Sequence, residues 1–329
     1  MIELDGSIGE GGGQVLRTAL TISCVLGKPV RITNIRKGRG TPGLKAQHLS
    51  VCNLLAKITN ASMIGAAIGS TEISFSPGKI DGGEYEIDIG TAGSCTLLSQ
   101  AVLPVLLHSK KDCTLSITGG THVSLSPTYE YFSEVFLPAA KKFGVNAGVE
   151  LKRAGFYPKG GGKIVLRTKH SELHGAVFSP QTHDEIKYSI ISSSLPPHVL
   201  DREEAEIARI FAGRKISGAK KSADAACPGN ACSVWSGFLG ASSLGAMGKP
   251  AEKVANEACK ALLFDIDSGA SVDSHLADQL LLYAALSYGK SSFSTSRFTD
   301  HLTTNAEVLR RLTGRDIILA ADRDVTVDQ

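Results

Sequence analysis

The sequence contains the same order of predicted elements three times, and this repetition restricts the fold more than any other feature. Each unit is predicted to run strand, glycine turn, helix, strand, loop, helix and two strands. The units occupy approximately residues 1–80, 84–168 and 270–329. A glutamine lies near the start of the first helix in every unit, at Gln14, Gln100 and Gln279. The pattern predicts an α+β fold of three βαβαββ repeats, each a sheet packed on two helices. The alternative is an α+β chain in which the order recurs by coincidence.

Residues from about 178 to 268 do not fit the repeat and separate the second unit from the third. This span is predicted to contain a strand, a helix, one or more strands and a final helix. Pro196 and Pro197 precede one acidic and apolar run, and Pro250 precedes another, as at helix starts. We therefore predict a large repeat domain of residues 1–177 and 269–329, with an inserted small α/β domain at 178–268.

The composition is that of a globular protein with a substantial core. Of the 329 residues, 42% are hydrophobic and 20% are charged, and no apolar run is long enough to span a bilayer. The first residues, MIELDGS, lack the basic and apolar regions of a signal peptide, so we expect a cytoplasmic protein without a membrane partner. The net charge of +3 is too small to indicate nucleic-acid binding by itself, so a basic site has to be local. A homo-oligomer is compatible with this composition.

The seven cysteines contain no CxxC pair. We expect mostly buried, reduced thiols. Cys227 and Cys232 are near enough in sequence to pair or to bind a metal, and an ordinary loop is the interpretation that we favour.

Residues 5–17, DGSIGEGGGQVLR, combine a strand end, a glycine loop and a helix start. Glycine lets the backbone approach a ligand closely, and the N–H groups of a helix N-terminus attract anions. Glu10 lies inside the loop and Arg17 lies about one turn into the helix. The segment therefore predicts a site for a metal and a phosphate, and a solvated glycine turn is the alternative.

A second loop, RKGRGTPGLKAQHL, concentrates positive charge. Its cations are Arg36, Lys37, Arg39 and Lys45, and they are followed by Gln47 and His48. Guanidinium groups interleaved with glycines can crowd around phosphates and hold nucleic acid without reading its sequence. The alternative is a solvated basic loop.

Three further turns are rich in small residues: IGTAGSCTLLSQ (89–100), GGTHVSLSPTYEY (119–131) and GFYPKGGG (155–162). Ser94 is a predicted helix cap. His122 and Lys159 are expected to be exposed and are candidates for substrate contact, and ordinary turns are the interpretation that we favour.

Two helix starts carry residues suited to nucleotide chemistry. In HLADQ (275–279), Asp278 could hold a metal or a nucleotide hydroxyl. In TDHLTTN, His301 lies just inside a helix start, which disfavours the imidazolium and favours a neutral nucleophile toward phosphorus. The alternative is a partly exposed histidine in a capping region.

Together these segments resemble the RNA 3′-terminal phosphate cyclase family, and the resemblance covers nearly the whole chain. Its motifs are DGSIGEGGGQVLRTAL, NIRKGRGTPGLKAQHL, GTAGSCTLLSQ, GFYPKGGG, LPPHV, CPGN, HLADQLLL and SRFTDHLTTN. The resemblance implies three repeats with an inserted domain, and a ligase-type enzyme with ATP as co-substrate. It also implies the reaction of that family, in which a histidine attacks the α-phosphorus of ATP and releases pyrophosphate, and AMP then moves to an RNA 3′-phosphate. In the last implied step, the neighbouring 2′-hydroxyl closes a 2′,3′-cyclic phosphate and releases AMP.

The same resemblance implies the residue roles. His301 is the implied nucleophile, and Glu10 is the implied ligand of a divalent metal, Mg²⁺ or Mn²⁺. The implied nucleotide contacts are Gln100, His275, Leu276, Ala277, Asp278, Gln279 and Arg17. The implied contacts to the RNA end or its phosphate are Arg36, Arg39, Gln47 and His48. Family members can carry tyrosine at the position of His275, which is the alternative nucleophile.

Two other functions are compatible with the pattern. One is a catalytically silent relative that binds RNA during ribosomal RNA processing. Such relatives lack the nucleophilic histidine, whereas His301 is present here. The other is an enolpyruvyl transferase, which has similar repeats but needs a basic cleft for phosphoenolpyruvate and no covalent histidine. Transfer of label from ATP to the protein would separate these functions.

Overall fold

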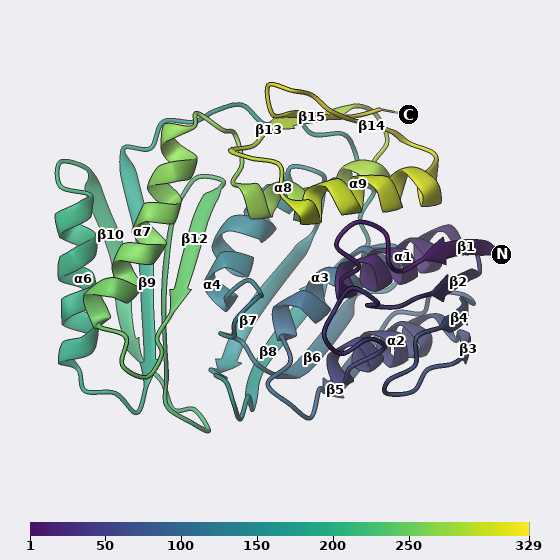
Figure 1. Ribbon diagram of the computed structural model, residues 1–329, viewed down its shortest axis with the longest axis horizontal. Helices are drawn as coiled ribbons and strands as arrows, with labels where there is room; N and C mark the ends of the chain where they lie inside the picture. The colour runs from purple at the N-terminus through teal and green to yellow at the C-terminus, as the bar shows by residue number, and fades with distance from the viewer. Residues whose placement is uncertain (329) are drawn as a thin grey trace.

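The computed structural model describes residues 1–328 (Figure 1). The first unit runs β1 (Ile2–Asp5), α1 (Gly13–Leu26), β2 (Val30–Thr33), α2 (Ala46–Thr59), β3 (Ser62–Ile64) and β4 (Ile73–Ser76). Its sheet has the order β1-β2-β4-β3, in which β1 and β2 are parallel. Helix α1 ends at Gly27, whose φ of 65° lies in the left-handed region that stops a helix. Alternate residues of β2 are buried, as in a strand with one face on the core.

The second unit has the same order of elements. It runs β5 (Glu84–Asp88), α3 (Cys95–Leu107), β6 (Cys113–Gly119), α4 (Tyr129–Tyr131), η1 (Phe132–Phe136), α5 (Leu137–Lys141), β7 (Ala147–Arg153) and β8 (Gly162–Thr168). The sheet order is β5-β6-β8-β7, again with a parallel first pair. Ser94 caps α3 by accepting from the backbone of Leu97, as predicted. The helix predicted near 127–143 is present, but a π-helical turn, η1, interrupts it.

The third unit lacks a regular first strand. It runs α8 (Ser274–Leu286), β13 (Ser291–Ser294), α9 (Asp300–Thr313), β14 (Asp316–Leu319) and β15 (Asp324–Asp328), with the antiparallel order β13-β15-β14. A single parallel bridge between Val272 and Thr295 stands where the strand is expected. The strand cannot continue, because the next residue, Asp273, already caps α8.

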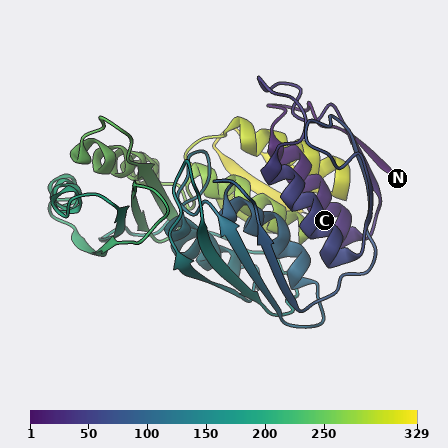
Figure 2. The same ribbon diagram turned by 90° about the horizontal axis from the view of Figure 1, so that it is seen from below.

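The span between the second and third units forms its own sheet and core. It runs β9 (Glu185–Ser193), α6 (His198–Ile210), β10 (Lys215–Ser222), β11 (Gly229–Ser236), β12 (Leu239–Leu244) and α7 (Ala251–Asp267). The sheet order is β10-β9-β11-β12, and a separate apolar cluster lies between this sheet and its helices. Pro197 and Pro250 directly precede α6 and α7, which confirms the predicted helix starts. We call residues 178–268 the inserted unit; it lies to one side of the other helices (Figure 2).

Helices from different units pack against one another and place their N-terminal turns together. Helix α1 contacts α3 and α9, and α8 contacts α9. Within residues 1–328, no helix has the length and apolarity needed to cross a membrane. The seven cysteines are free and buried, so Cys227 and Cys232 are not joined. The coarse fold prediction is confirmed, since the chain is α+β with sheets packed on helices.

Candidate functional site

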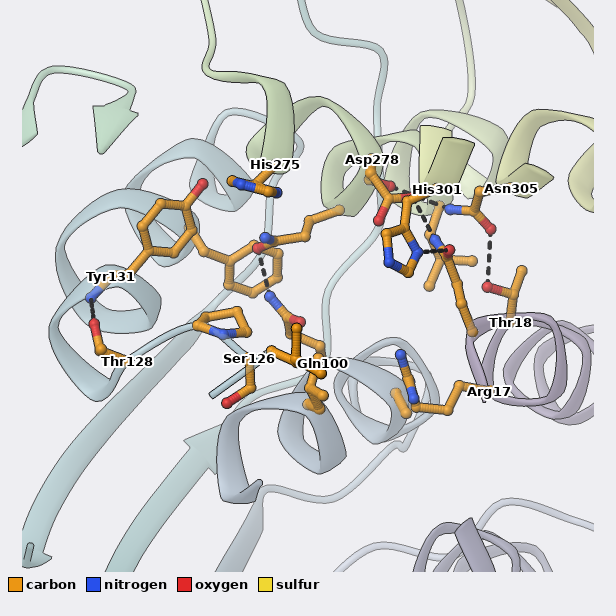
Figure 3. A pocket seen from close by; sticks show the side chains of 18 of the residues that line it. Arg17, Thr18, Gln100, Ser126, Thr128, Tyr131, His275, Asp278, His301 and Asn305 are labelled. Atoms are coloured by element: carbon orange, nitrogen blue, oxygen red, sulfur yellow. Dashed lines mark hydrogen bonds between the residues drawn. The ribbon is translucent and has the colours of Figure 1, made fainter. Parts of the chain in front are cut away.

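A cavity of about 440 Å³ lies where α1, α3, α8 and α9 meet the segment 125–131 and strand β12 (Figure 3). It brings together residues from all three units and from the inserted unit. The predicted site residues that line it are Arg17, Gln100, His275, Asp278, Gln279 and His301. These residues are separated by up to 284 positions in the sequence, so only the packing of the four helices unites them.

A hydrogen-bonded chain fixes the ring of His301. The side-chain amide nitrogen of Gln14 donates to the carboxylate of Asp278, so the amide oxygen of Gln14 faces the other way. That oxygen lies 2.6 Å from Nδ1 of His301. Because an amide oxygen only accepts, Nδ1 of a neutral ring has to carry the proton. The lone pair then lies on Nε2, and the His301 side chain is 49% exposed.

The first turn of α9, which carries His301, is anchored to two other helices. The side chain of Thr299 caps this helix by accepting from the backbone of Leu302, at 3.1 Å. Thr18 on α1 donates to the side-chain oxygen of Asn305 at 2.9 Å. The amide nitrogen of Asn305 donates to the backbone carbonyl of Asp278 on α8, at 3.2 Å. The histidine is therefore held on a rigid element rather than on a loop.

Glu10 lies beside this histidine, and the hydrogen bonding of one of its carboxylate oxygens is incomplete. Its Oε1 atom lies 2.9 Å from Nη2 of Arg39 and 3.1 Å from Nδ1 of His301. Within residues 1–328 this buried oxygen has no well-aligned hydrogen bond. Such an oxygen suits a divalent cation. Among these residues no group of three or more acidic, histidine or cysteine side chains could hold a metal alone, so phosphate oxygens would have to complete the coordination.

The glycine loop allows charged groups to close on the N-terminus of α1. A Cβ on Gly12 would lie 2.5 Å from Oε1 of Glu10, and a Cβ on Gly13 would lie 2.2 Å from Nε2 of His48. The first turn of α1 has no acidic residue and no side-chain cap. Its free N–H groups, together with the nearby Arg17, make this end a favourable place for a phosphate.

Burial sets the charge of three groups around this end. Removal from water, reinforced by the cations Arg17, Arg36 and Lys45, lowers the pKa of His48 to about 3, so its ring is neutral. Burial also lowers the pKa of Arg17, although Asp278 and Glu10 act in the opposite direction. Burial raises the pKa of Asp278, against the opposing effects of His301, Gln14 and Arg17. Arg17 and Asp278 therefore depend on each other for charge compensation.

The structure places some predicted residues outside the cavity. Leu276 and Ala277 are fully buried in the apolar core and do not line it. Arg36 is buried and donates to the carbonyls of Thr41 and Gly43, at 2.7 and 2.8 Å, so it shapes its own loop. Gln47 is half-buried against Gly93.

One exposure prediction is wrong. His122 is buried, not exposed: it pairs with Glu130 at 2.8 Å and stacks on Phe156. A histidine in a glycine-rich turn gave no sign that a buried carboxylate would pair with it. Lys159 is exposed, as predicted.

Several residues of the cavity were not among the predicted site residues. They include Gln14, Thr18, Tyr131, Asn305 and the segment 240–242 of the inserted unit. The repeated position of Gln14, Gln100 and Gln279 was a usable signal, because Gln100 and Gln279 are themselves hydrogen-bonded at 2.5 Å. The contribution of the inserted unit had no such signal in the sequence.

Comparisons with known proteins agree along nearly the whole chain. The family model for RNA 3′-terminal phosphate cyclase matches residues 8–319. The RNA 3′-terminal phosphate cyclase of Archaeoglobus fulgidus is 43% identical over 318 residues, which cover 96% of this chain and 96% of that protein. The protein of the same name from Methanosarcina barkeri is 46% identical over 307 residues, which cover 93% of this chain and 92% of that protein. Among solved structures, the enolpyruvyl transferase NikO from Streptomyces tendae gives a TM-score of only 0.43 at 14% identity, covering 99% of this chain and 47% of that chain, which supports no conclusion about function.

Proposed function

Since the chain belongs to the RNA 3′-terminal phosphate cyclase family, we propose that its cavity cyclises RNA 3′-phosphates by transfer of AMP through His301. The chain is an RNA 3′-terminal phosphate cyclase, an ATP-dependent RNA-processing enzyme of the ligase type. The residue roles below are our assignment. The observation that carries them is the hydrogen bond between Nδ1 of His301 and the amide oxygen of Gln14.

The first step uses the lone pair on Nε2 of His301. This nitrogen forms a bond to the α-phosphorus of ATP while the bond from that phosphorus to pyrophosphate breaks. Nδ1 keeps its proton and donates a hydrogen bond to the amide oxygen of Gln14. As the ring gains positive charge, the carboxylate of Glu10, 3.1 Å from Nδ1, stabilises it electrostatically.

Phosphate charge is offset by the N-terminus of α1 and by two arginines. Arg17 lines the cavity, and Arg39 reaches Glu10 at 2.9 Å. The guanidinium groups would contact the phosphates of ATP or of the RNA end. Glu10 is the residue that would hold Mg²⁺ or Mn²⁺ together with phosphate oxygens, and such a metal would polarise a phosphoryl oxygen.

The later steps need two phosphates in one place. An oxygen of the RNA 3′-phosphate attacks the phosphorus of AMP, and the P–N bond returns its electron pair to Nε2 of His301. The 2′-hydroxyl oxygen then bonds to the 3′-phosphorus while its proton passes to solvent, and the anhydride bond to AMP breaks so that AMP leaves. Because the 2′-hydroxyl belongs to the same ribose, this step gains from proximity.

The nucleoside would lie farther along the cavity. His275, Asp278 and Gln279 face it from the first turns of α8, and Gln100 faces it from α3. Amide and carboxylate groups of this kind suit the hydroxyls and ring nitrogens of a nucleoside.

We also propose that residues 178–268 are a domain inserted into the repeats. A cytoplasmic location and a homo-oligomeric state remain predictions.

The function is tested with an oligoribonucleotide that ends in a 3′-phosphate. With ATP and Mg²⁺, the protein should yield a 2′,3′-cyclic phosphate, AMP and pyrophosphate. Two control oligonucleotides, one with a 3′-hydroxyl and one with a terminal 2′-deoxyribose, should not cyclise. Absence of cyclic product from the 3′-phosphate substrate would contradict the proposed function.

A further inference from the structure

Asp273 joins the inserted unit to the helix that carries three of the proposed nucleotide contacts. It is fully buried between Tyr131, strand β12 and the N-terminus of α8. Its Oδ1 atom accepts from the backbone N–H groups of His275 and Leu276, at 2.9 and 2.8 Å. Its Oδ2 atom accepts from the backbone N–H of Gly240, at 3.0 Å.

The two carboxylate oxygens thus have different tasks. Oδ1 caps α8, whereas Oδ2 reaches the inserted unit through Gly240. The hydroxyl of Tyr131 lies 2.8 Å from both oxygens and braces the carboxylate from the second unit. A second bond runs in parallel, because the backbone N–H of Asp273 donates to the carbonyl of Phe238 at 3.3 Å.

The contact is tight and borders the cavity. A Cβ on Gly240 would lie 2.6 Å from Val135 and 3.1 Å from Tyr131, so the strand of the inserted unit packs directly on the second unit. Gly240 and Tyr131 line the same cavity as His275 and Asp278. Figure 3 places Tyr131 and His275 on one side of it, away from Arg17. A small movement of β12 would therefore change the shape of the cavity where the nucleoside is proposed to lie.

We propose that Asp273 is a positioning residue through which the inserted unit fixes the first turn of α8 and thereby raises the affinity of the cavity for ATP. This inference rests on the proposed function for the identity of the ligand. It assigns a task to the inserted unit, which supplies one wall of the cavity and a brace for the opposite helix. One carboxylate serves both the cap of α8 and the hydrogen bond between the units.

The surroundings of Asp273 support a bracing task. Asp265, at the end of α7, is near enough to Asp273 for the two carboxylates to interact electrostatically, and it accepts a hydrogen bond from the hydroxyl of Ser296. Burial raises the pKa of both carboxyl groups to about 6. Burying two acids that interact electrostatically costs stability, and the hydrogen bonds at Asp273 offset part of that cost.

The substitution Asp273→Asn separates the two tasks. Asparagine is as good a helix cap as aspartate, so its oxygen can keep the bonds to His275 and Leu276. The side-chain nitrogen that replaces Oδ2 cannot accept from Gly240, so the N–H of Gly240 loses its partner. Tyr131→Phe removes only the bracing hydroxyl. The matched control is Tyr129→Phe, because the hydroxyl of Tyr129 donates to the carbonyl of Val149 at 3.3 Å and does not line the cavity.

We would measure the ATP concentration for half-maximal formation of the protein–AMP adduct, the rate at saturating ATP, and hydrogen exchange of the amides at 274–278. Asp273→Asn should raise the half-saturating ATP concentration about ten-fold, with a rate at saturation within about two-fold of the parent. Its α8 amides should exchange faster. Tyr131→Phe should raise the half-saturating ATP concentration and the exchange of the α8 amides by smaller factors. Tyr129→Phe should match the parent in both measurements.

An unchanged half-saturating ATP concentration with unchanged exchange would overturn the proposal. So would a loss of rate at saturation without any shift in half-saturation, since that pattern belongs to chemistry rather than positioning. If Asp273→Asn does not fold, Tyr131→Phe decides between the same outcomes. If the parent forms no adduct, the proposed function fails, whereas hydrogen exchange with and without ATP still tests the brace.

Discussion

Nδ1 of His301 lies 2.6 Å from the amide oxygen of Gln14, and the amide nitrogen of Gln14 donates to Asp278. The three residues come from α9, α1 and α8. This series of hydrogen bonds fixes the tautomer of the histidine without placing a second base beside Nε2. A buried carboxylate acting through an amide thus holds the ring as a directly bonded carboxylate does in a catalytic triad.

Replacing Gln14 with methionine should slow AMP transfer to the protein. The change keeps the volume but removes both hydrogen bonds, so the ring is free to rotate and to place its proton on Nε2. We expect the rate at saturating ATP to fall about 10²-fold. The control is Ser23→Ala, at the far end of α1, where the hydroxyl donates to the carbonyl of Lys28. A rate within two-fold of the parent would show that Gln14 does not orient the histidine.

Replacing Glu10 with glutamine should raise the requirement for divalent metal. The variant keeps the shape of the side chain but loses the charge that a cation needs. Titration with Mg²⁺ should show a half-saturating concentration raised about ten-fold or more. Asp5→Asn is the control, since Asp5 is an exposed carboxylate that bonds to Ser7 at the same strand end. Superimposable titrations of parent and Glu10 variant would remove Glu10 from the metal site.

His48 should give the protein an acid-sensitive contribution to stability. Its pKa is about 3 in the folded state and close to 6.5 when unfolded. Between these values the unfolded state binds the extra proton, so stability rises with pH from 3 to 6.5 and is complete above it. Asparagine at position 48 keeps an acceptor near Nδ1 but cannot be protonated. The loss in unfolding free energy between pH 7 and pH 4 should be smaller in His48→Asn by about 3 kcal/mol, as measured by urea titration. Equal losses would contradict the buried neutral ring.

Arg39 should discriminate RNA ends by their phosphate. Its side chain is 43% exposed and rests on Glu10, so it can turn toward a terminal phosphate. In Arg39→Ala, RNA with a 3′-phosphate should bind about ten-fold more weakly, whereas RNA with a 3′-hydroxyl should change little. Arg31→Ala is the control, because Arg31 pairs with Glu72 on an exposed surface. An unaltered preference for the 3′-phosphate would mean that this arginine is only solvated.

The order of elements could be predicted because each element carries its own local signals. Periodic apolar residues marked α1, and prolines marked the starts of α6 and α7. The missing first strand of the third unit could not be foreseen. The strand is interrupted because Asp273 caps α8 at the position where the strand would continue. The hydrogen bonds that hold Asp273 there come from Tyr131 and Gly240, which are distant in the sequence.

Candidate site residues that stand in contiguous motifs could be named from the sequence, whereas those that reach the cavity only through packing were missed. His301, Glu10 and Asp278 stand in recognisable segments. The bond from Gln14 to His301 joins positions 287 apart, and no local pattern reports it. His122 was wrongly expected to be exposed. A polar residue in a turn suggested exposure, whereas the side chain is buried and pairs with Glu130.

Mapping the protein–AMP adduct tests most directly whether His301 carries AMP. The protein would be incubated with α-labelled ATP, Mg²⁺ and pyrophosphatase, then denatured and digested with trypsin. We expect an acid-labile, alkali-stable label on the peptide spanning 298–310, in which His301 is the one histidine. Label on the peptide that contains His275, or no label at all, would contradict it.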